Sequence, residues 1–272
     1  MRAVLPRRAS RTAGPQSARK TSKVPPLRGV VPFLLFLCLW QLVGTDDSVF
    51  YPRPSSWLQA LSLLSRQGVL WPATWSTLTT LALSMVVATL VGAAVGYLVG
   101  RSPPADRALL PTLEFLRATP AAAVVPVFLV FMGFGRDMAI TVVTFASVWP
   151  ILLNTRAGAR ALNPVLMDSA RSLHLGPWAR ITKIVIPALM PSIFLGVRVA
   201  APVAVVMTLL VEFIVQFYGV GSLIAAAQRD YASAAVYGLV VVAGIFGLGV
   251  NSMVALVESF CLRHHGPGSG RR

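Results

Sequence analysis

The chain is poor in charged residues, and above all in acidic ones. Only 12% of its 272 residues are charged while 56% are hydrophobic, and Asp and Glu number 9 against 24 Lys and Arg. A soluble globular domain carries about 25% charged residues. Half that fraction cannot cover a water-facing surface of this size, which excludes a soluble enzyme. A disordered chain is excluded because it would be poor in apolar residues. The composition predicts an integral membrane protein.

Cysteine and histidine are also scarce. Cys38 and Cys261 lie at opposite ends of the chain, so we expect no structural disulfide. His174, His264 and His265 lack a second ligand at metal spacing, so we expect no metal site. The sequence has no Gly-Lys pair and therefore no P-loop for ATP. Because no Ser/His/Asp set stands in a nucleophile context, we expect no catalytic residue.

Long apolar runs divide the chain. Six of them are candidate membrane spans: 29–45, 74–100, 118–135, 138–155, 186–211 and 231–257, of which only 186–211 contains a charged residue, Arg198. The first is short, since a transmembrane helix needs about 20 residues. Helices are expected because they satisfy the backbone within one segment in lipid. The prediction is an all-α polytopic membrane protein, with a transmembrane domain over 29–263 between tails at 1–28 and 264–272.

The basic residues predict the topology. Of the 24 Lys and Arg, 19 fall in the two tails and in the 101–117 and 156–183 loops, and four fall in the other loops. Cytoplasmic loops carry the excess of positive charge, so both termini are predicted to be cytoplasmic, as an even number of spans requires. The tail 1–28 holds eight positive charges and no acid, and we expect a disordered arm near the lipid rather than a nucleic-acid site.

Small residues recur every four positions in the second run, at Ala88, Gly92, Gly96 and Gly100. They share one helix face and predict the close approach of another helix.

Two charged residues, Arg198 and Glu212, lie on the fifth span. They are 14 residues apart, about 21 Å along a helix, so they cannot pair with each other. They either line a solute pathway, where Arg198 would contact an anion, or act as buried structural anchors. The second interpretation is preferred.

The loop at about 156–187 is not simply polar. Asn163 and Pro164 are a helix cap and a first helical residue. Leu166, Ala170 and Leu173 then form an apolar stripe, and Gly176-Pro177 is expected to end the helix. The stripe either packs on the membrane domain of the chain itself or docks a soluble partner, and the residues alone leave both open.

This loop resembles the EAA loop of binding-protein-dependent ABC importer permeases, which contains Glu-Ala-Ala, three residues, Gly, nine residues and Ile-x-Leu-Pro. The spacing is intact, and Ala170, Ile184 and Pro187 match. Asp168, Ser169, His174 and Ile186 are substitutions. Segments 51–54, 115–135 and 187–221 are similar to further patterns of the family, most of all in the branch that imports nitrate, sulfonates and taurine.

The resemblance implies a type I importer bundle of six helices in the bacterial cytoplasmic membrane, moving a small anion such as a sulfonate, taurine or nitrate. Its partners would be an ABC ATPase subunit, an extracytoplasmic substrate-binding protein and a second permease copy as a homodimer. No cofactor is implied for this chain, because ATP and Mg would bind the ATPase. The implied coupling residues are Asp168, Ser169, Ala170, Arg171, Leu173, His174, Gly176, Ile184 and Pro187.

Two points stay open at this level. Where the family has Gly, His174 either takes a strained left-handed conformation or lets the turn shift toward Gly176. The alternatives to an ABC permease are a self-sufficient secondary transporter or channel, and a membrane enzyme. The first needs midplane carboxylates or an internal repeat and the second a polar catalytic cluster, and the sequence displays neither.

Overall fold

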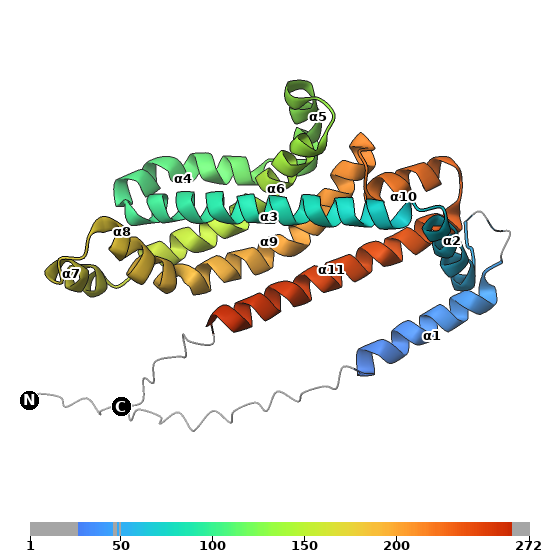
Figure 1. Cartoon of the computed structure of the whole chain (residues 1–272), viewed down its shortest axis with the longest axis horizontal. Coiled ribbons are helices and arrows are strands. Elements are labelled where there is room, and N and C mark those ends of the chain that lie inside the picture. The colour runs from blue at the N-terminus through green and yellow to red at the C-terminus, as the bar shows by residue number, and fades with distance from the viewer. Residues whose placement is uncertain (1–26, 46–47, 49, 263–272) are drawn as a thin grey trace, which may run out of the picture. The chain divides into compact units, whose positions relative to one another are not determined.

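The computed structural model describes residues 27–45, 48 and 50–262, in which every regular element is a helix (Figure 1). The predicted tails lie outside the described residues, apart from Leu27 and Arg28. The chain forms two units, Met1–Val43 and Gly44–Arg272. The first contains helix α1 (Leu27–Val43), on which Phe36 and Trp40 pack edge to face with ring centroids 5.4 Å apart.

The second unit begins with α2 and ends with α11. Its elements in chain order are α2 (Pro54–Arg66), α3 (Leu70–Arg101), α4 (Pro103–Ala118), α5 (Ala121–Met132), α6 (Arg136–Arg160), α7 (Pro164–Ser172), α8 (Pro177–Arg180), the π-helix η1 (Ile181–Val185), α9 (Ile186–Val215), α10 (Val220–Arg229) and α11 (Ser233–Leu262).

Four helical segments in the described part of the chain are long and apolar enough to cross a membrane. They are α3, α6, α11 and a continuous 39-residue segment, Pro177–Val215, made of α8, η1 and α9. These helices contain the runs predicted at 74–100, 138–155 and 186–211, and all but the first two residues of the run predicted at 231–257. The described helix of the first predicted run, α1, has 17 residues and is too short for the same test.

The span predicted at 118–135 has a different form. Its helix, α5, has only 12 residues, and together with α4 it makes a pair bent by 92° that could count as one further span. The break lies at Thr119-Pro120, where Thr119 is extended with ψ 124°. Proline disfavours the helical conformation of the residue before it, which explains why α4 ends at Ala118.

Glycines bring the central helices into backbone contact. A Cβ atom on Gly96 of α3 would lie 2.5 Å from the carbonyl oxygen of Leu152, and one on Gly100 would lie 2.5 Å from that of Arg156. On a neighbouring face of α6, a Cβ on Gly196 of α9 would lie 2.6 Å from Cα of Ile151. The close approach predicted from the small residues of α3 is confirmed, and α6 packs against both α3 and α9.

Candidate functional site

Helix α7 begins where the sequence predicts. The side-chain oxygen of Asn163 accepts a hydrogen bond from the backbone N–H of Val165 at 3.0 Å, and Pro164 is the first helical residue. The cap satisfies a donor that the first turn leaves without a partner, and proline has no N–H to satisfy. The end differs from the expectation, because the helix stops at Ser172, before Gly176-Pro177.

His174 closes this helix in a left-handed conformation, with φ 52°. The N–H of Leu175 then bonds to the carbonyl oxygen of Ala170 at 3.1 Å, which is the closing hydrogen bond of a helix end that commonly uses glycine. Gly176, in contrast, has an ordinary φ of −62°. Of the two alternatives for the turn, the structure therefore has the one in which the histidine itself adopts the rare backbone conformation.

The apolar stripe of α7 is divided between two surroundings. Ala170 is 1% exposed, whereas Leu166 is 47% exposed and Leu173 is 72% exposed. Met167, on the inner side, packs on a cluster that includes Val185. The inner part of α7 thus packs on the chain itself, whereas in the described part of the chain Leu166 on α7 is half-exposed and Leu173, directly after α7, is largely exposed.

The other residues of the resemblance lie around this helix. Asp168, Ser169 and Gly176 are exposed, Ile184 is half-buried in η1, and Pro187 is in the first turn of α9. Arg171 belongs to α7, and its side chain is outside the described part of the structure.

The segment after α7 is tied back to it. The guanidinium Nε of Arg180 on α8 donates to the carbonyl oxygen of Leu175 at 2.7 Å. The π-helix η1 follows without a break and leads into α9. Single π-turns inside α-helices are frequent at functional sites. The result is a continuous helical connection from Pro177 to a membrane-spanning helix, tied to the turn at His174 by the Arg180 hydrogen bond.

A buried carboxylate holds the neighbouring helix ends together. Asp106 of α4 is 4% exposed and pairs with Arg156 and Arg160 of α6. The Arg160 contact is 2.6 Å, and a second Arg156 bond is 3.0 Å. From the sequence, Arg156 and Arg160 were counted only as basic loop residues, and their pairing with Asp106 was not predicted. The pattern that could have predicted the pairing is the spacing of Arg156 and Arg160, which are four residues apart and therefore on one helix face, together with the scarcity of acidic residues in the 101–117 loop.

Glu212 is a buried anchor between three helices. Its Oε2 accepts from the Thr77 hydroxyl of α3 at 2.9 Å and from the N–H of Gly221 at the start of α10 at 3.0 Å. The same Thr77 hydroxyl accepts the N–H of Val220 at 2.9 Å. A Cβ on Gly219 would collide with the Glu212 carboxylate. The carboxylate therefore stands at the N-terminal end of α10, where the helix dipole favours negative charge.

Arg198 has different surroundings. Its side chain is 59% exposed and lies 3.9 Å from the carboxylate of Glu258 on α11. The interpretation as a buried anchor therefore fits Glu212 but does not fit Arg198 in the single chain.

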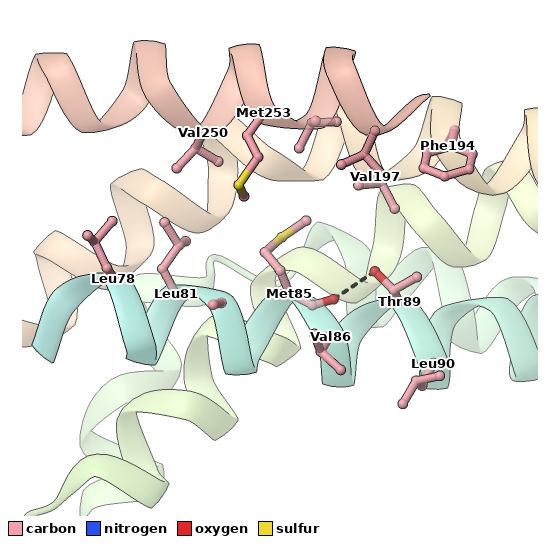
Figure 2. A pocket seen from close by; sticks show the side chains of 13 residues that line it. Leu78, Leu81, Met85, Val86, Thr89, Leu90, Phe194, Val197, Val250 and Met253 are labelled. Atoms are coloured by element: carbon pink, nitrogen blue, oxygen red, sulfur yellow. Dashed lines mark hydrogen bonds between the residues drawn. The ribbon is translucent and has the colours of Figure 1, made fainter. Parts of the chain in front are cut away.

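An apolar cleft in the membrane-spanning part of the chain does not suit an anion. It lies between α3, α9 and α11, has a volume of about 410 Å³, and is lined by hydrocarbon and thioether side chains such as Leu78, Met85 and Met253 (Figure 2). Its one hydroxyl, on Thr89, donates to the carbonyl oxygen of Met85 at 2.7 Å. Within the described ranges, no three His, Cys, Asp or Glu side chains gather to hold a metal ion.

Comparison with known proteins gives the wider context. Residues 88–260 match the family described as binding-protein-dependent transport system inner membrane component. The bicarbonate transport system permease protein CmpB of Synechocystis sp. is 31% identical over 95% of this chain and 98% of its own. The putative aliphatic sulfonates transport permease protein SsuC of Bacillus subtilis is 25% identical over 87% of each chain.

A solved structure supports the fold. The crystal structure of an amino acid ABC transporter with histidines contains a chain that is 18% identical to this one, with a TM-score of 0.54, over 73% of this chain and 96% of the other. The family match covers residues 88–260, and the similarity to CmpB covers 95% of this chain. The chain therefore belongs to the family of binding-protein-dependent transport system inner membrane components.

Proposed function

We propose that this chain is the permease subunit of an ATP-driven importer of a small anion, and that α7 is where a separate ATPase subunit docks. The observation that carries the docking role is the divided stripe of α7. Leu166 and Leu173 are exposed on a helix outside the charge-free runs, so lipid does not cover them. Exposed apolar surface of this kind marks an interaction site.

The ligand class follows from the relatives. The names of CmpB and SsuC specify bicarbonate and aliphatic sulfonates, which are both small anions. We infer a solute of the same class, such as a sulfonate, taurine or nitrate. No side chain of this chain is assigned as its ligand.

The proposed topology has six spans. It adds α1 and the run 118–135, which contains α5, to the four long segments, and it places both termini, the 101–117 loop with α4, and α7 in the cytoplasm. The support is the distribution of basic residues, because this topology places 19 of the 24 Lys and Arg residues on the cytoplasmic side.

The proposed assembly contains a second permease copy, an ATPase subunit for each α7 and an extracytoplasmic binding protein. ATP and Mg bind the ATPase, since this sequence has no P-loop. The coupling residues are those of the EAA-like segment, from Asp168 to Pro187. When the ATPases close, they move α7 and, through the Arg180 contact, the membrane segment that follows.

The test is co-purification of the chain with its candidate ATPase subunit from detergent. Leu173→Asp puts a charge into the exposed face of α7, and Leu58→Asp is the matched control, because Leu58 on α2 is 71% exposed and Leu173 is 72% exposed. We expect the ATPase to be lost with Leu173→Asp and kept with Leu58→Asp. Equal retention by both variants would overturn the docking role. Transport by the chain alone, without ATPase or ATP, would favour a secondary transporter.

A further inference from the structure

A second cavity lies beside α7, on the side away from its exposed leucines. It has a volume of about 450 Å³ and is bounded by the last turns of α3 and α6, the first turn of α4 and one residue of α7. The residues that matter for the argument are Tyr97, Arg101, Asp106, Arg107, Arg160 and Met167.

The charge of this cavity is unbalanced. Three arginines line it together with a single carboxylate, Asp106. That carboxylate is already bound by Arg160 and by Arg156 behind it. The contacts of the other two arginines are with neutral oxygens: Arg101 donates to the Tyr97 hydroxyl at 2.9 Å and Arg107 to the Pro103 carbonyl at 3.3 Å. Both side chains are exposed, so their remaining N–H groups are available to an anion.

The position of the cavity identifies the kind of anion. It opens where the charge-free run 74–100 ends, which is the level of the membrane–water boundary. Part of its wall is apolar, formed by Ala159, Leu162 and Met167. One guanidinium group can donate hydrogen bonds to two oxygens of a phosphate group at once. Basic pockets between helices at the level of the membrane boundary suit the headgroups of anionic lipids.

We propose that the cavity between α3, α4, α6 and α7 is a binding site for a phosphate group, held by Arg101 and Arg107, and that its source is the headgroup of an anionic phospholipid. The Asp106–Arg156–Arg160 cluster is the fixed wall of this site. Because Met167 belongs to α7, a bound headgroup braces that helix against the membrane domain. This last consequence rests on the proposed function of α7, whereas the binding itself does not.

The experiment uses the purified full chain in phosphatidylcholine nanodiscs, without any ATPase. Binding is measured as the shift of the thermal unfolding midpoint in two arms: phosphatidylglycerol added to the discs, and inorganic phosphate added to the buffer with sodium chloride of equal ionic strength as reference. The double variant Arg101→Gln/Arg107→Gln leaves Asp106 and its partners intact. Arg117→Gln is the control, because Arg117 lies on the same helix as Arg107 but pairs with Glu114 at 2.8 Å.

We expect the double variant to bind phosphatidylglycerol roughly 10- to 100-fold more weakly, since each lost hydrogen bond between charged groups changes the constant about tenfold. Arg117→Gln should bind like the unchanged chain. A response to inorganic phosphate as strong as that to the lipid would overturn the lipid source and leave a soluble anion site. Equal binding by the double variant and the unchanged chain, or no binding by the unchanged chain, would overturn the site.

A second measurement separates this proposal from the function of α7. With the ATPase present, ATP hydrolysis is compared in discs with and without phosphatidylglycerol, and the lipid effect should disappear in Arg101→Gln/Arg107→Gln. If the ATPase does not bind the chain at all, the proposed function fails while the lipid shift of the isolated chain still tests the site. If phosphatidylglycerol shifts the unfolding midpoint but does not change the rate of ATP hydrolysis, the lipid site stands and only the proposed bracing of α7 is overturned.

Discussion

The packing of α3 against α6 predicts opposite effects for the same substitution at two glycines. Gly96 faces backbone, and an added Cβ would stand 2.5 Å from the Leu152 carbonyl oxygen and 2.9 Å from Cβ of Thr155. Gly244 on α11 has no atom within 4 Å of such a Cβ. Both glycines lie within helices, and neither has a positive φ.

The magnitudes follow from these surroundings. Replacing glycine by alanine in a helix stabilises the folded chain by about 0.5–1 kcal/mol, because alanine has less freedom to lose. At Gly96 the helices must also separate, and overpacking of a tight interface costs about 1–3 kcal/mol. The net expectation is a loss of about 1–2 kcal/mol for Gly96→Ala, and a gain of up to about 1 kcal/mol for Gly244→Ala.

The assay is reversible unfolding of the purified chain in mixed micelles with increasing sodium dodecyl sulfate, followed by tryptophan fluorescence. The two variants are compared with the unchanged chain under identical conditions. Equal free energies of unfolding for Gly96→Ala and Gly244→Ala would refute the reasoning, because they would show that α3 and α6 are not in backbone contact at Gly96.

Three further predictions concern single residues. His174→Gly should change coupled ATP hydrolysis by less than about twofold, since the histidine already has the φ that a glycine would supply; a large gain would mean that the histidine impairs coupling. Asp106→Asn should lower the free energy of unfolding, because it removes the negative charge that pairs with Arg156 and Arg160, whereas Asp137→Asn, also in the first turn of a helix, should have little effect in the same titration. Thr77→Val should cost about 1–3 kcal/mol, because the Glu212 carboxylate and the Val220 N–H both lose a partner; Thr79→Val is the control, since its hydroxyl bonds only within α3, and equal losses for the two variants would contradict the anchor.

Local patterns predicted part of this fold. The four-residue recurrence of small side chains on α3 is a property of one helix face, and it was sufficient to predict the close approach of another helix, although not that this helix is α6. The start of α7 was predictable for the same reason, because a cap and a proline act within a single turn. Charge-free runs of 27 residues at 74–100 and 231–257 predicted α3 and α11.

Other features depend on residues far apart in the chain. Asp106 meets arginines 50 and 54 positions later, and Glu212 meets Thr77, 135 positions earlier. Hydropathy alone likewise missed the bend between α4 and α5, because the run across Thr119-Pro120 stays apolar although the helix does not continue. For α7, the sequence predicted the stripe but could not divide it, since the burial of Ala170 depends on helices on which it packs.

The uninterrupted path from α8 through η1 to α9 has a mechanical consequence. The segment of 39 residues is about 58 Å long, and its backbone is continuous although Pro191 and Pro202 each remove one hydrogen bond between successive turns. A displacement near Pro177 is therefore passed along the backbone of one helix rather than across a contact between side chains. The wider turn of η1 and the two interior prolines are the positions at which this segment can bend, so such a displacement divides between tilting the whole segment and bending it there.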